Sequence, residues 1–265
     1  MKHFQYDYVL ATVKAGLSPL LIGESGTGKS TIAKAIADDL NIPFYVITGT
    51  YQTSQAAFLG FYDVNSNYSP TLFRKAVEFG GIFVIEELTA MDPNTILCLN
   101  SLDNGFVPFP DGVIDVHPDF HLIATANPVT VQYGARANLD FSTLNRYYTI
   151  KINYDQTLAS NIASTKAIDD VTILRDFLKS YGSSITLTMR DEILYDKLLE
   201  LGLDDNPLLR LIDNTSDELK QAFTAYLAQI EEDKRKRALT QADMTTFDEL
   251  KDRILYEAEL TNTGE

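Results

Sequence analysis

Short apolar runs recur along the first 155 residues of the chain, and polar or amphipathic stretches separate them. The runs are rich in β-branched and aromatic residues and occupy Leu20–Ile22, Phe44–Thr48, Ile82–Ile85, His121–Thr125 and Tyr147–Ile152. Short apolar strands that alternate with helical segments are typical of a parallel sheet covered on both faces. The pattern therefore predicts an α/β domain with a five-stranded parallel sheet over residues 1–155.

The strand pattern stops after Tyr154, and the remaining residues are predicted to be helical. Thr215 and Glu218 have the spacing of a capping box, and apolar residues follow them at helical intervals. Thr246 and Glu249 repeat this spacing. Apolar stripes of this kind are typical of packing faces. We therefore expect a smaller, all-helical domain over residues 156–265.

The loop after the first predicted strand carries the clearest chemistry. It has the G-x-x-x-x-G-K-S pattern of a phosphate-binding loop, between an apolar run and a helix-like segment. The N–H groups of such a loop and the dipole of the following helix hold an anion. Lys29 is expected to reach the β- and γ-phosphates, and the Ser30 hydroxyl to ligate Mg²⁺. The predicted nucleotide-binding residues are Gly23, Glu24, Ser25, Gly26, Thr27, Gly28, Lys29, Ser30 and Thr31.

Two adjacent carboxylates, Glu86 and Glu87, end the third apolar run. A buried strand places such acids at the carboxyl edge of the sheet, where ligands bind in α/β folds. Neighbouring strand residues point to opposite sides, so one acid can face the Mg²⁺ at Ser30 while the other orients a water. Glu86 is the predicted metal ligand, here longer by one methylene than the usual aspartate and able to act through a metal-bound water. Glu87 is the predicted catalytic carboxylate; the alternative is a strand end that meets solvent.

A polar residue also follows the fourth apolar run, in the segment Thr125-Ala126-Asn127-Pro128. If this strand lies beside the strand that carries the acids, Asn127 can hydrogen-bond the attacking water or the γ-phosphate. Taken alone, Asn-Pro indicates a turn. Together with the phosphate-binding loop and the acids, Asn127 becomes a candidate sensor of the nucleotide.

Charge and composition narrow the class of protein. The chain has 37 acidic and 22 basic residues among 265, and its net charge of −15 repels nucleic acid and anionic membranes on average. The basic cluster 234–237 directly follows the acids 231–233, which favours ion pairs on a solvated helix over a nucleic-acid patch. Cys98 is the one cysteine, so a disulfide framework and a cysteine zinc site are excluded, and its apolar neighbours predict a buried thiol. No signal pattern or membrane-length apolar run is present, so we expect a cytoplasmic protein.

The ordered motifs resemble those of an AAA+ ATPase. They are the phosphate-binding loop, the apolar strand ending in two acids, Thr125-Ala126-Asn127-Pro128 and Leu144-Asn145-Arg146-Tyr147. The resemblance covers about residues 17–200. Within the AAA+ ATPases, the chain resembles the branch that contains MoxR-type chaperones, CobS, McrB and the midasin and dynein modules. Within it, the chain is most similar to compact CobS/MoxR-like ATPases, often carried by phages. The resemblance implies a three-layer αβα domain and a helical lid that bind ATP and Mg²⁺.

The resemblance also implies roles for particular residues. Asn127 corresponds to the sensor-1 residue, and Arg190 to the sensor-2 arginine, although Asp191 could instead hold Arg190 in a local ion pair. Arg146 matches the arginine finger that reaches the nucleotide of a neighbouring subunit, and Arg136 is the rival candidate. The family's two pore-lining inserts correspond to residues 52–70 and 104–117. Their aromatic residues could grip a polypeptide or pack; they are Phe61, Tyr62, Phe106 and Phe109.

These features lead to one favoured function and two alternatives. The favoured one is a Mg-ATP-dependent ATPase that forms a ring, such as a homo-hexamer, and remodels or assembles a protein partner. A DNA-handling motor is possible on the same scaffold, and the acidic charge argues against it. A nucleotide-gated binding module with little hydrolysis is the third reading, because Glu86 departs from the usual aspartate.

Overall fold

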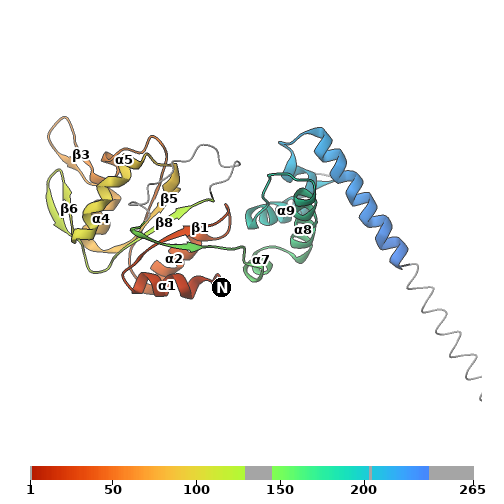
Figure 1. The fold of residues 1–265 in the computed structure, drawn as a ribbon, viewed down its shortest axis with the longest axis horizontal. Helices are drawn as coiled ribbons and strands as arrows, with labels where there is room; N and C mark the ends of the chain where they lie inside the picture. The colour runs from red at the N-terminus through yellow and green to blue at the C-terminus, as the bar shows by residue number, and fades with distance from the viewer. Residues whose placement is uncertain (1, 129–144, 203–204, 239–265) are drawn as a thin grey trace, which may run out of the picture.

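A computed structural model describes residues 2–128, 145–202 and 205–238 of the chain. A five-stranded parallel sheet has the order β2-β5-β8-β1-β9. The strands are β1 (Ser18–Ile22), β2 (Phe44–Thr48), β5 (Gly81–Glu86), β8 (Phe120–Ala126) and β9 (Tyr147–Lys151). A group of helices follows the sheet along the chain and lies beside it (Figure 1). The predicted α/β fold with five parallel strands and a helical region after it is confirmed.

The sheet is the middle of three layers because its strands are apolar on both faces. Alternate residues of one strand point to opposite sides, so Phe83 and Val84 of β5 enter different hydrophobic clusters. On one face the cluster includes residues of α1 (Tyr6–Lys14) and α2 (Lys29–Leu40). On the other face it includes residues of α4 (Leu72–Phe79) and of the segment with α5 (Pro93–Ile96).

Two hairpins project from the same end of the sheet domain (Figure 1). The first insert contains α3 (Ala56–Leu59), β3 (Phe61–Tyr62) and β4 (Tyr68–Ser69). The second, β6 (Phe106–Phe109) and β7 (Gly112–Asp115), follows η1 (Leu88–Ala90) and η2 (Leu97–Asn104). The predicted hairpin over 104–117 is correct, but its turn is not Asp-Gly. Phe109 pairs with Gly112, so Pro110 and Asp111 form the turn and Gly112 opens the return strand.

Arg74 of α4 contacts both hairpins. Its guanidinium is buried and donates from Nη1 to Asp111 Oδ1 at 2.5 Å, in the turn of the second hairpin. The same group lies over the rings of Tyr68 in the first hairpin and Phe109 in the second, at 5.7 and 4.8 Å. The Tyr62 hydroxyl adds a hydrogen bond to Pro110 O at 3.3 Å. The two inserts are therefore joined by side chains as well as by position.

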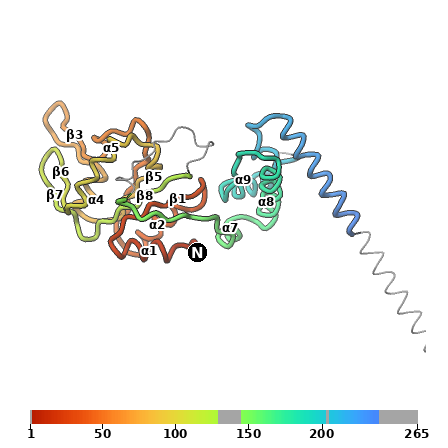
Figure 2. The backbone as a smooth tube through the Cα atoms, viewed as in Figure 1, coloured from red at the N-terminus to blue at the C-terminus, as the bar shows by residue number. Residues whose placement is uncertain are grey.

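The chain leaves the sheet after Lys151 and enters the helical region at Gln156, next to the predicted domain boundary (Figure 2). The helices are α7 (Gln156–Ile162), α8 (Thr165–Ser180), α9 (Met189–Leu201), η4 (Pro207–Ile212) and a helix over 217–238. They enclose a separate hydrophobic cluster that contains Phe177 and Phe223. Among the described residues, no helix combines the length and the apolar character that a membrane span needs.

Local signals start the helices of this region. Asp155, Ser164 and Thr188 accept backbone N–H bonds as N-caps of α7, α8 and α9. The cap of the helix over 217–238 is Ser216, whose hydroxyl accepts from Leu219 N at 3.3 Å, one residue later than the predicted Thr215. The predicted second capping box lies outside the described residues.

Cys98 lies in η2 and packs against the hydrophobic cluster under α4. Burial raises the pKa of its thiol to about 12. The thiolate is the nucleophilic form, and it is scarce at neutral pH when the pKa is this high. The predicted packing role of the thiol is consistent with this position.

Candidate nucleotide-binding site

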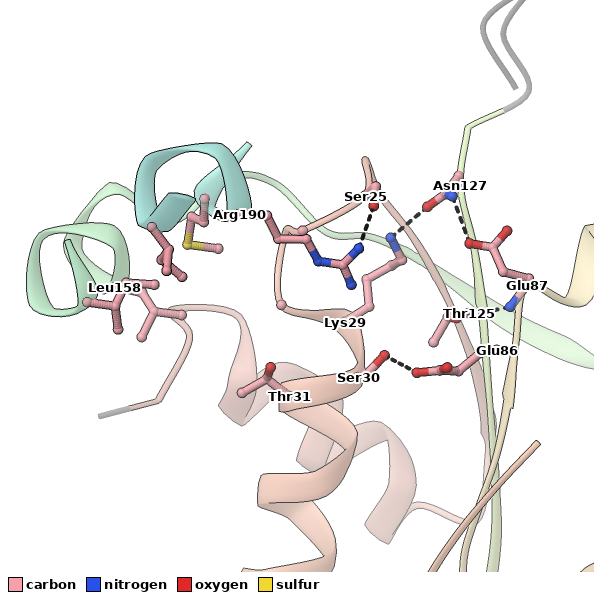
Figure 3. A pocket seen from close by; sticks show the side chains of 15 residues that line it. Ser25, Lys29, Ser30, Thr31, Glu86, Glu87, Thr125, Asn127, Leu158 and Arg190 are labelled. Atoms are coloured by element: carbon pink, nitrogen blue, oxygen red, sulfur yellow. Dashed lines mark hydrogen bonds between the residues drawn. The ribbon is translucent and has the colours of Figure 1, made fainter. Parts of the chain in front are cut away.

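The carboxyl ends of three adjacent strands bring the phosphate-binding loop, both strand-end acids and Asn127 to one edge of the sheet. The phosphate-binding loop follows β1, Glu86 ends β5 with Glu87 directly after it, and Asn127 follows β8. Because β8 pairs in parallel with both β1 and β5, the three strand ends are neighbours. Figure 3 shows these side chains around a single cavity.

The loop holds its shape through two glycines and one side chain. Gly26 and Gly28 have φ values of +81° and +88°, which are accessible to glycine and strained for other residues. Thr27 Oγ1 donates to Glu24 O at 2.9 Å and fastens the start of the turn. No side-chain hydrogen bond caps the start of α2, and residues 28–31, where this helix begins, line the cavity. A helix start of this kind suits a phosphate group.

The Lys29 side chain is buried at the centre of the site. Its Nζ donates to Gly23 O at 2.6 Å, to Glu24 O at 2.9 Å and to Asn127 Oδ1 at 2.9 Å. These acceptors are carbonyl oxygens, and Lys29 lies among residues that line the cavity (Figure 3). These three hydrogen bonds hold the ammonium at the cavity, where it can contact an anionic ligand.

The predicted metal ligands meet directly. The Ser30 hydroxyl donates to Glu86 Oε1, and Thr48 Oγ1 donates to Glu86 Oε2 at 3.3 Å. The extra methylene of Glu86 does not keep its carboxylate away from Ser30. Hydroxyl and carboxylate oxygens are ligands that Mg²⁺ accepts, and the ion usually takes its other ligands from water and substrate phosphates. In the part of the chain that the structure describes, no cluster of three or more acidic, histidine or cysteine side chains offers a fuller protein cage.

Glu87 occupies a strained backbone position. Its φ is +56°, in the left-handed region, and its N–H donates to Thr125 Oγ1 at 3.4 Å. The chain has left strand geometry here, so Glu86 and Glu87 both line the cavity instead of pointing to opposite faces. Asn127 Nδ2 donates to Glu87 Oε1 at 2.8 Å. The Asn127 amide thus joins Lys29 through its oxygen and Glu87 through its nitrogen (Figure 3).

The helical region lines part of the cavity, whose volume is about 380 Å³. Arg190 Nη1 donates to Ser25 Oγ at 3.1 Å, so the predicted sensor-2 arginine contacts the phosphate-binding loop. The alternative local ion pair with Asp191 is not what holds it. Asp191 Oδ2 instead accepts from the N–H and the hydroxyl of Thr188 at 2.7 and 3.0 Å, in a capping box that starts α9. Thr31, as predicted, also lines the cavity.

An apolar wall of the cavity was not predicted. It is formed by residues of α7 and α9, namely Leu158, Ile162, Met189 and Ile193. Each helix contributes two residues four positions apart, which lie on one helix face. This spacing is the only feature of the sequence that could have indicated the wall, but the packing face of any helix has the same spacing. Beside a phosphate-binding loop, an apolar wall suits the base of a nucleotide.

Arg146 lies far from the loop of its own chain. It directly precedes β9, at the amino end of the sheet, where Tyr147 pairs with Ser18 at the start of β1. The loop follows the opposite end of β1, where Ile22 pairs with Lys151. Arg146 Nε donates to Asp103 Oδ2 at 2.8 Å in this position. The geometry excludes a role of Arg146 in its own cavity, and the rival Arg136 lies outside the described residues.

Gly26 is where the loop touches the start of α9. A Cβ atom added at Gly26 would lie 2.5 Å from Thr188 Oγ1, closer than real Cβ contacts. We expect Gly26→Ala to push α9 from the loop and weaken nucleotide binding by at least about tenfold, or about 1.4 kcal/mol. Titration with a fluorescent ATP analogue measures this effect.

Gly105→Ala is the matched control for this variant. Gly105 has a nearly identical φ of +79°, but an added Cβ would meet no atom within 4 Å. Both substitutions carry the left-handed strain of about 1–2 kcal/mol, which thermal unfolding measures. Equal nucleotide affinities of the two variants would contradict a role for the contact between Gly26 and Thr188.

Comparisons with known proteins address the family of the chain. A family model described as "AAA domain (dynein-related subfamily)" matches residues 18–147. The gas vesicle ATPase GvpN of Ancylobacter aquaticus is 26% identical over 278 residues, covering 90% of this chain and 77% of GvpN. An uncharacterised protein of Staphylococcus saprophyticus is 25% identical over 193 residues, covering 66% of this chain and 70% of that protein.

A solved structure supports the fold. NtrX from Brucella abortus in complex with ADP superposes with a TM-score of 0.50 at 17% sequence identity. The match covers 77% of this chain and 50% of the NtrX chain, so the chain spans half the length of that protein. Residues 18–147, which hold the phosphate-binding loop, both strand-end acids and Asn127, match the model of the AAA domain of the dynein-related subfamily, as the resemblance of the motifs predicts.

Proposed function

We propose that this chain hydrolyses ATP with Mg²⁺ in a ring of identical subunits and uses the cycle to remodel or assemble a protein partner. The observation that carries the proposal is the hydrogen-bonded arrangement of Lys29, Asn127 and Glu87 beside the Ser30–Glu86 pair in one cavity. It combines a cation for the phosphates, a carboxylate for a water and two hard ligands for a metal ion. The relative GvpN, named a gas vesicle ATPase, supports the reaction type.

Each group has a distinct part in the proposed reaction. The loop N–H groups and Lys29 bind the phosphates, and the apolar wall from α7 and α9 receives the base. Ser30 and Glu86 would hold Mg²⁺, which neutralises phosphate charge when bound. Glu87 takes a proton from the attacking water, and Asn127 orients that water or the γ-phosphate.

Asn127 links the occupancy of the phosphate site to the state of Glu87. The Asn127 amide bonds both Lys29 and Glu87 in the structure. When the γ-phosphate attracts the Lys29 ammonium, the Asn127 oxygen loses a donor and the amide can turn toward the substrate. Glu87 then loses the bond from Asn127 Nδ2 and can accept a proton from water. In this proposal hydrolysis waits for a bound triphosphate.

The proposed protein partner would meet the two joined hairpins. Phe109, one of the four aromatic residues singled out in the inserts, is buried at 6% exposure and packs against Phe73. Phe61, Tyr62 and Phe106 remain exposed at 55%, 50% and 40%. Exposed aromatic side chains suit contact with a polypeptide. We place this activity in the cytoplasm, which for a phage-encoded chain is that of the host.

The basic cluster bears on the DNA-motor alternative. Residues 234–237 belong to the helix over 217–238, and Lys236 Nζ lies 2.7 Å from Glu232 Oε1. This i,i+4 pair supports the ion-pair interpretation of the cluster. The favoured function predicts little response of ATP turnover to duplex DNA. Stimulation by DNA with a steep salt dependence would instead favour the motor.

Steady-state phosphate release with Mg-ATP tests the reaction itself. We expect the specific activity of the wild type to rise with protein concentration, because a composite site needs a neighbouring subunit. Light scattering with and without ATP measures the accompanying assembly. A wild type that binds ATP and releases no phosphate at any concentration would instead support the gated binding module.

A further inference from the structure

A buried charged cluster lies where the helical region joins the sheet domain. Glu192 of α9 has 0% exposure. Its Oε1 accepts from the Tyr154 hydroxyl at 2.6 Å and from Arg175 Nη2 at 2.8 Å, while its Oε2 has no hydrogen-bond partner among the described residues. Burying a carboxylate is unfavourable unless it is well paired, and here one oxygen carries both bonds. The proposed reaction does not use this cluster, so its presence requires another explanation.

The cluster joins three separate segments. Tyr154 belongs to the linker 152–155 between β9 and α7, Arg175 belongs to α8, and Glu192 belongs to α9. The Arg175 guanidinium lies 5.0 Å from the centre of the Tyr154 ring. Arg175 Nε also donates to the carbonyl oxygen of Leu187, directly before the N-cap of α9, at 3.2 Å. The start of α9 is therefore held by the linker and by α8 together.

The linker is itself fixed to the sheet domain by the N-terminal segment. The Gln5 side chain donates to Lys151 O at 2.7 Å and accepts from Asn153 N at 2.9 Å. Phe4 N donates to Asp155 Oδ2 at 2.7 Å. These bonds lie on both sides of Tyr154 along the chain. Tyr154 is therefore held to the sheet domain on both sides, and its hydroxyl bonds α9 at Glu192.

The same turn of α9 carries the contact with the phosphate-binding loop. Arg190 bonds Ser25 from this turn, and Gly26 lies against the N-cap Thr188. Residues two positions apart on a helix point in different directions. Arg190 accordingly lines the cavity while Glu192 is buried on another side of the helix. A change in the Glu192 contacts would rotate or shift the turn that presents Arg190.

We propose that Glu192 is a positioning residue: its bonds to Tyr154 and Arg175 set the angle at which α9 presents Arg190 to the phosphates of the nucleotide. This inference rests on the proposed function, because it gives Arg190 a phosphate to contact. Burial, followed by the bond to Glu192, raises the pKa of Tyr154, so its hydroxyl keeps its proton and donates at neutral pH.

Tyr154→Phe removes a single hydroxyl and tests the proposal with a closely matched control. Tyr195→Phe removes the bond from Tyr195 OH to Asp170 Oδ2 at 2.8 Å, which likewise joins a tyrosine hydroxyl to a carboxylate but lies within the helical region. Burial and the carboxylate raise the pKa of Tyr195 as well, and Tyr195 does not line the cavity. We expect Tyr154→Phe to weaken ATP binding and raise KM about tenfold, and Tyr195→Phe to change either less than about twofold. We expect the two variants to lose similar amounts of Tm, so that a difference in ATP binding between them does not come from a difference in stability.

A double-mutant cycle with Arg190→Ala separates positioning from general destabilisation. If Glu192 acts through Arg190, Tyr154→Phe changes ATP affinity less than about twofold once Arg190 is alanine. A full tenfold effect in that background, or equal effects of Tyr154→Phe and Tyr195→Phe, would overturn the inference. Binding of a fluorescent ATP analogue is measured throughout. A wild type that binds nucleotide without turnover refutes the proposed hydrolysis and leaves this binding test intact.

Discussion

Replacing Glu87 with glutamine is expected to abolish ATP turnover and to leave ATP binding intact. The amide of glutamine cannot take a proton from water, and loss of a general base lowers rates by about 10²–10⁴-fold. Its oxygen can still accept the bond that Asn127 Nδ2 now gives to Glu87 Oε1. Lys29 and the loop keep their geometry, so the phosphates keep their binding groups. Phosphate release and titration with a fluorescent ATP analogue measure the two effects separately.

Two further variants show whether the loss of turnover is specific to Glu87. Glu200→Gln makes the same chemical change on an exposed position of α9 outside the cavity, and we expect wild-type turnover from it. Glu86→Gln alters the predicted metal ligand beside Ser30, and we expect it to raise the Mg²⁺ concentration needed for half-maximal rate. If Glu87→Gln hydrolyses ATP within a few-fold of the wild type, Glu87 is not the base.

Replacing Arg146 with alanine is expected to lower turnover by about 10³-fold or more while ATP affinity stays nearly unchanged. Arg146 lies at the amino end of β9, whereas the phosphate-binding loop follows the carboxyl end of β1. It can therefore act on ATP only in the cavity of another subunit. An arginine supplied there stabilises the charge of the transferring phosphoryl group and adds little to binding of the ground state.

Asp103 provides the control for this prediction. Asp103 Oδ2 accepts the bond from Arg146 Nε, so Asp103→Asn weakens the ion pair and keeps the arginine. If Arg146 only supported the fold through this pair, the two variants would lose activity alike. A catalytic Arg146 predicts that Asp103→Asn retains most of the turnover. Thermal unfolding checks that both variants remain folded.

Mixing two inactive variants tests action between subunits. Arg146→Ala keeps a normal Glu87, and Glu87→Gln keeps a normal Arg146. In a mixed ring, the cavity of the first variant can receive the arginine of the second. We expect activity to reappear at intermediate ratios, and no recovery at any ratio would refute the trans assignment.

The sheet could be predicted closely because a buried parallel strand is nearly all apolar. Gly81–Glu86 is buried along its length until the final acid, and the apolar run Ile82–Ile85 in the sequence marks the middle of this strand. The loop pattern and the polar residues at strand ends then placed Lys29, Glu87 and Asn127 at one edge without knowledge of the strand order. Parallel strands align their carboxyl ends, which makes this inference independent of the order.

Other parts of the site depend on contacts between distant segments, which no local pattern encodes. The contact of Gly26 with Thr188 joins positions 162 apart, and the bond from Arg190 to Ser25 joins positions 165 apart. The apolar wall has the spacing of an ordinary packing face. The backbone of Glu87 was also not predictable, because positive φ is uncommon outside glycine and the sequence shows a glutamate there.

The backbone conformation of Glu87 favours glycine, whereas the proposed chemistry needs a carboxylate at the same position. A glutamate with a φ of +56° carries strain that glycine would not, of about 1–3 kcal/mol. Glycine at this position would therefore make the protein harder to unfold and remove the carboxylate at the same time. A screen that ranks variants of this chain by melting temperature would therefore select against the proposed catalytic carboxylate at this codon.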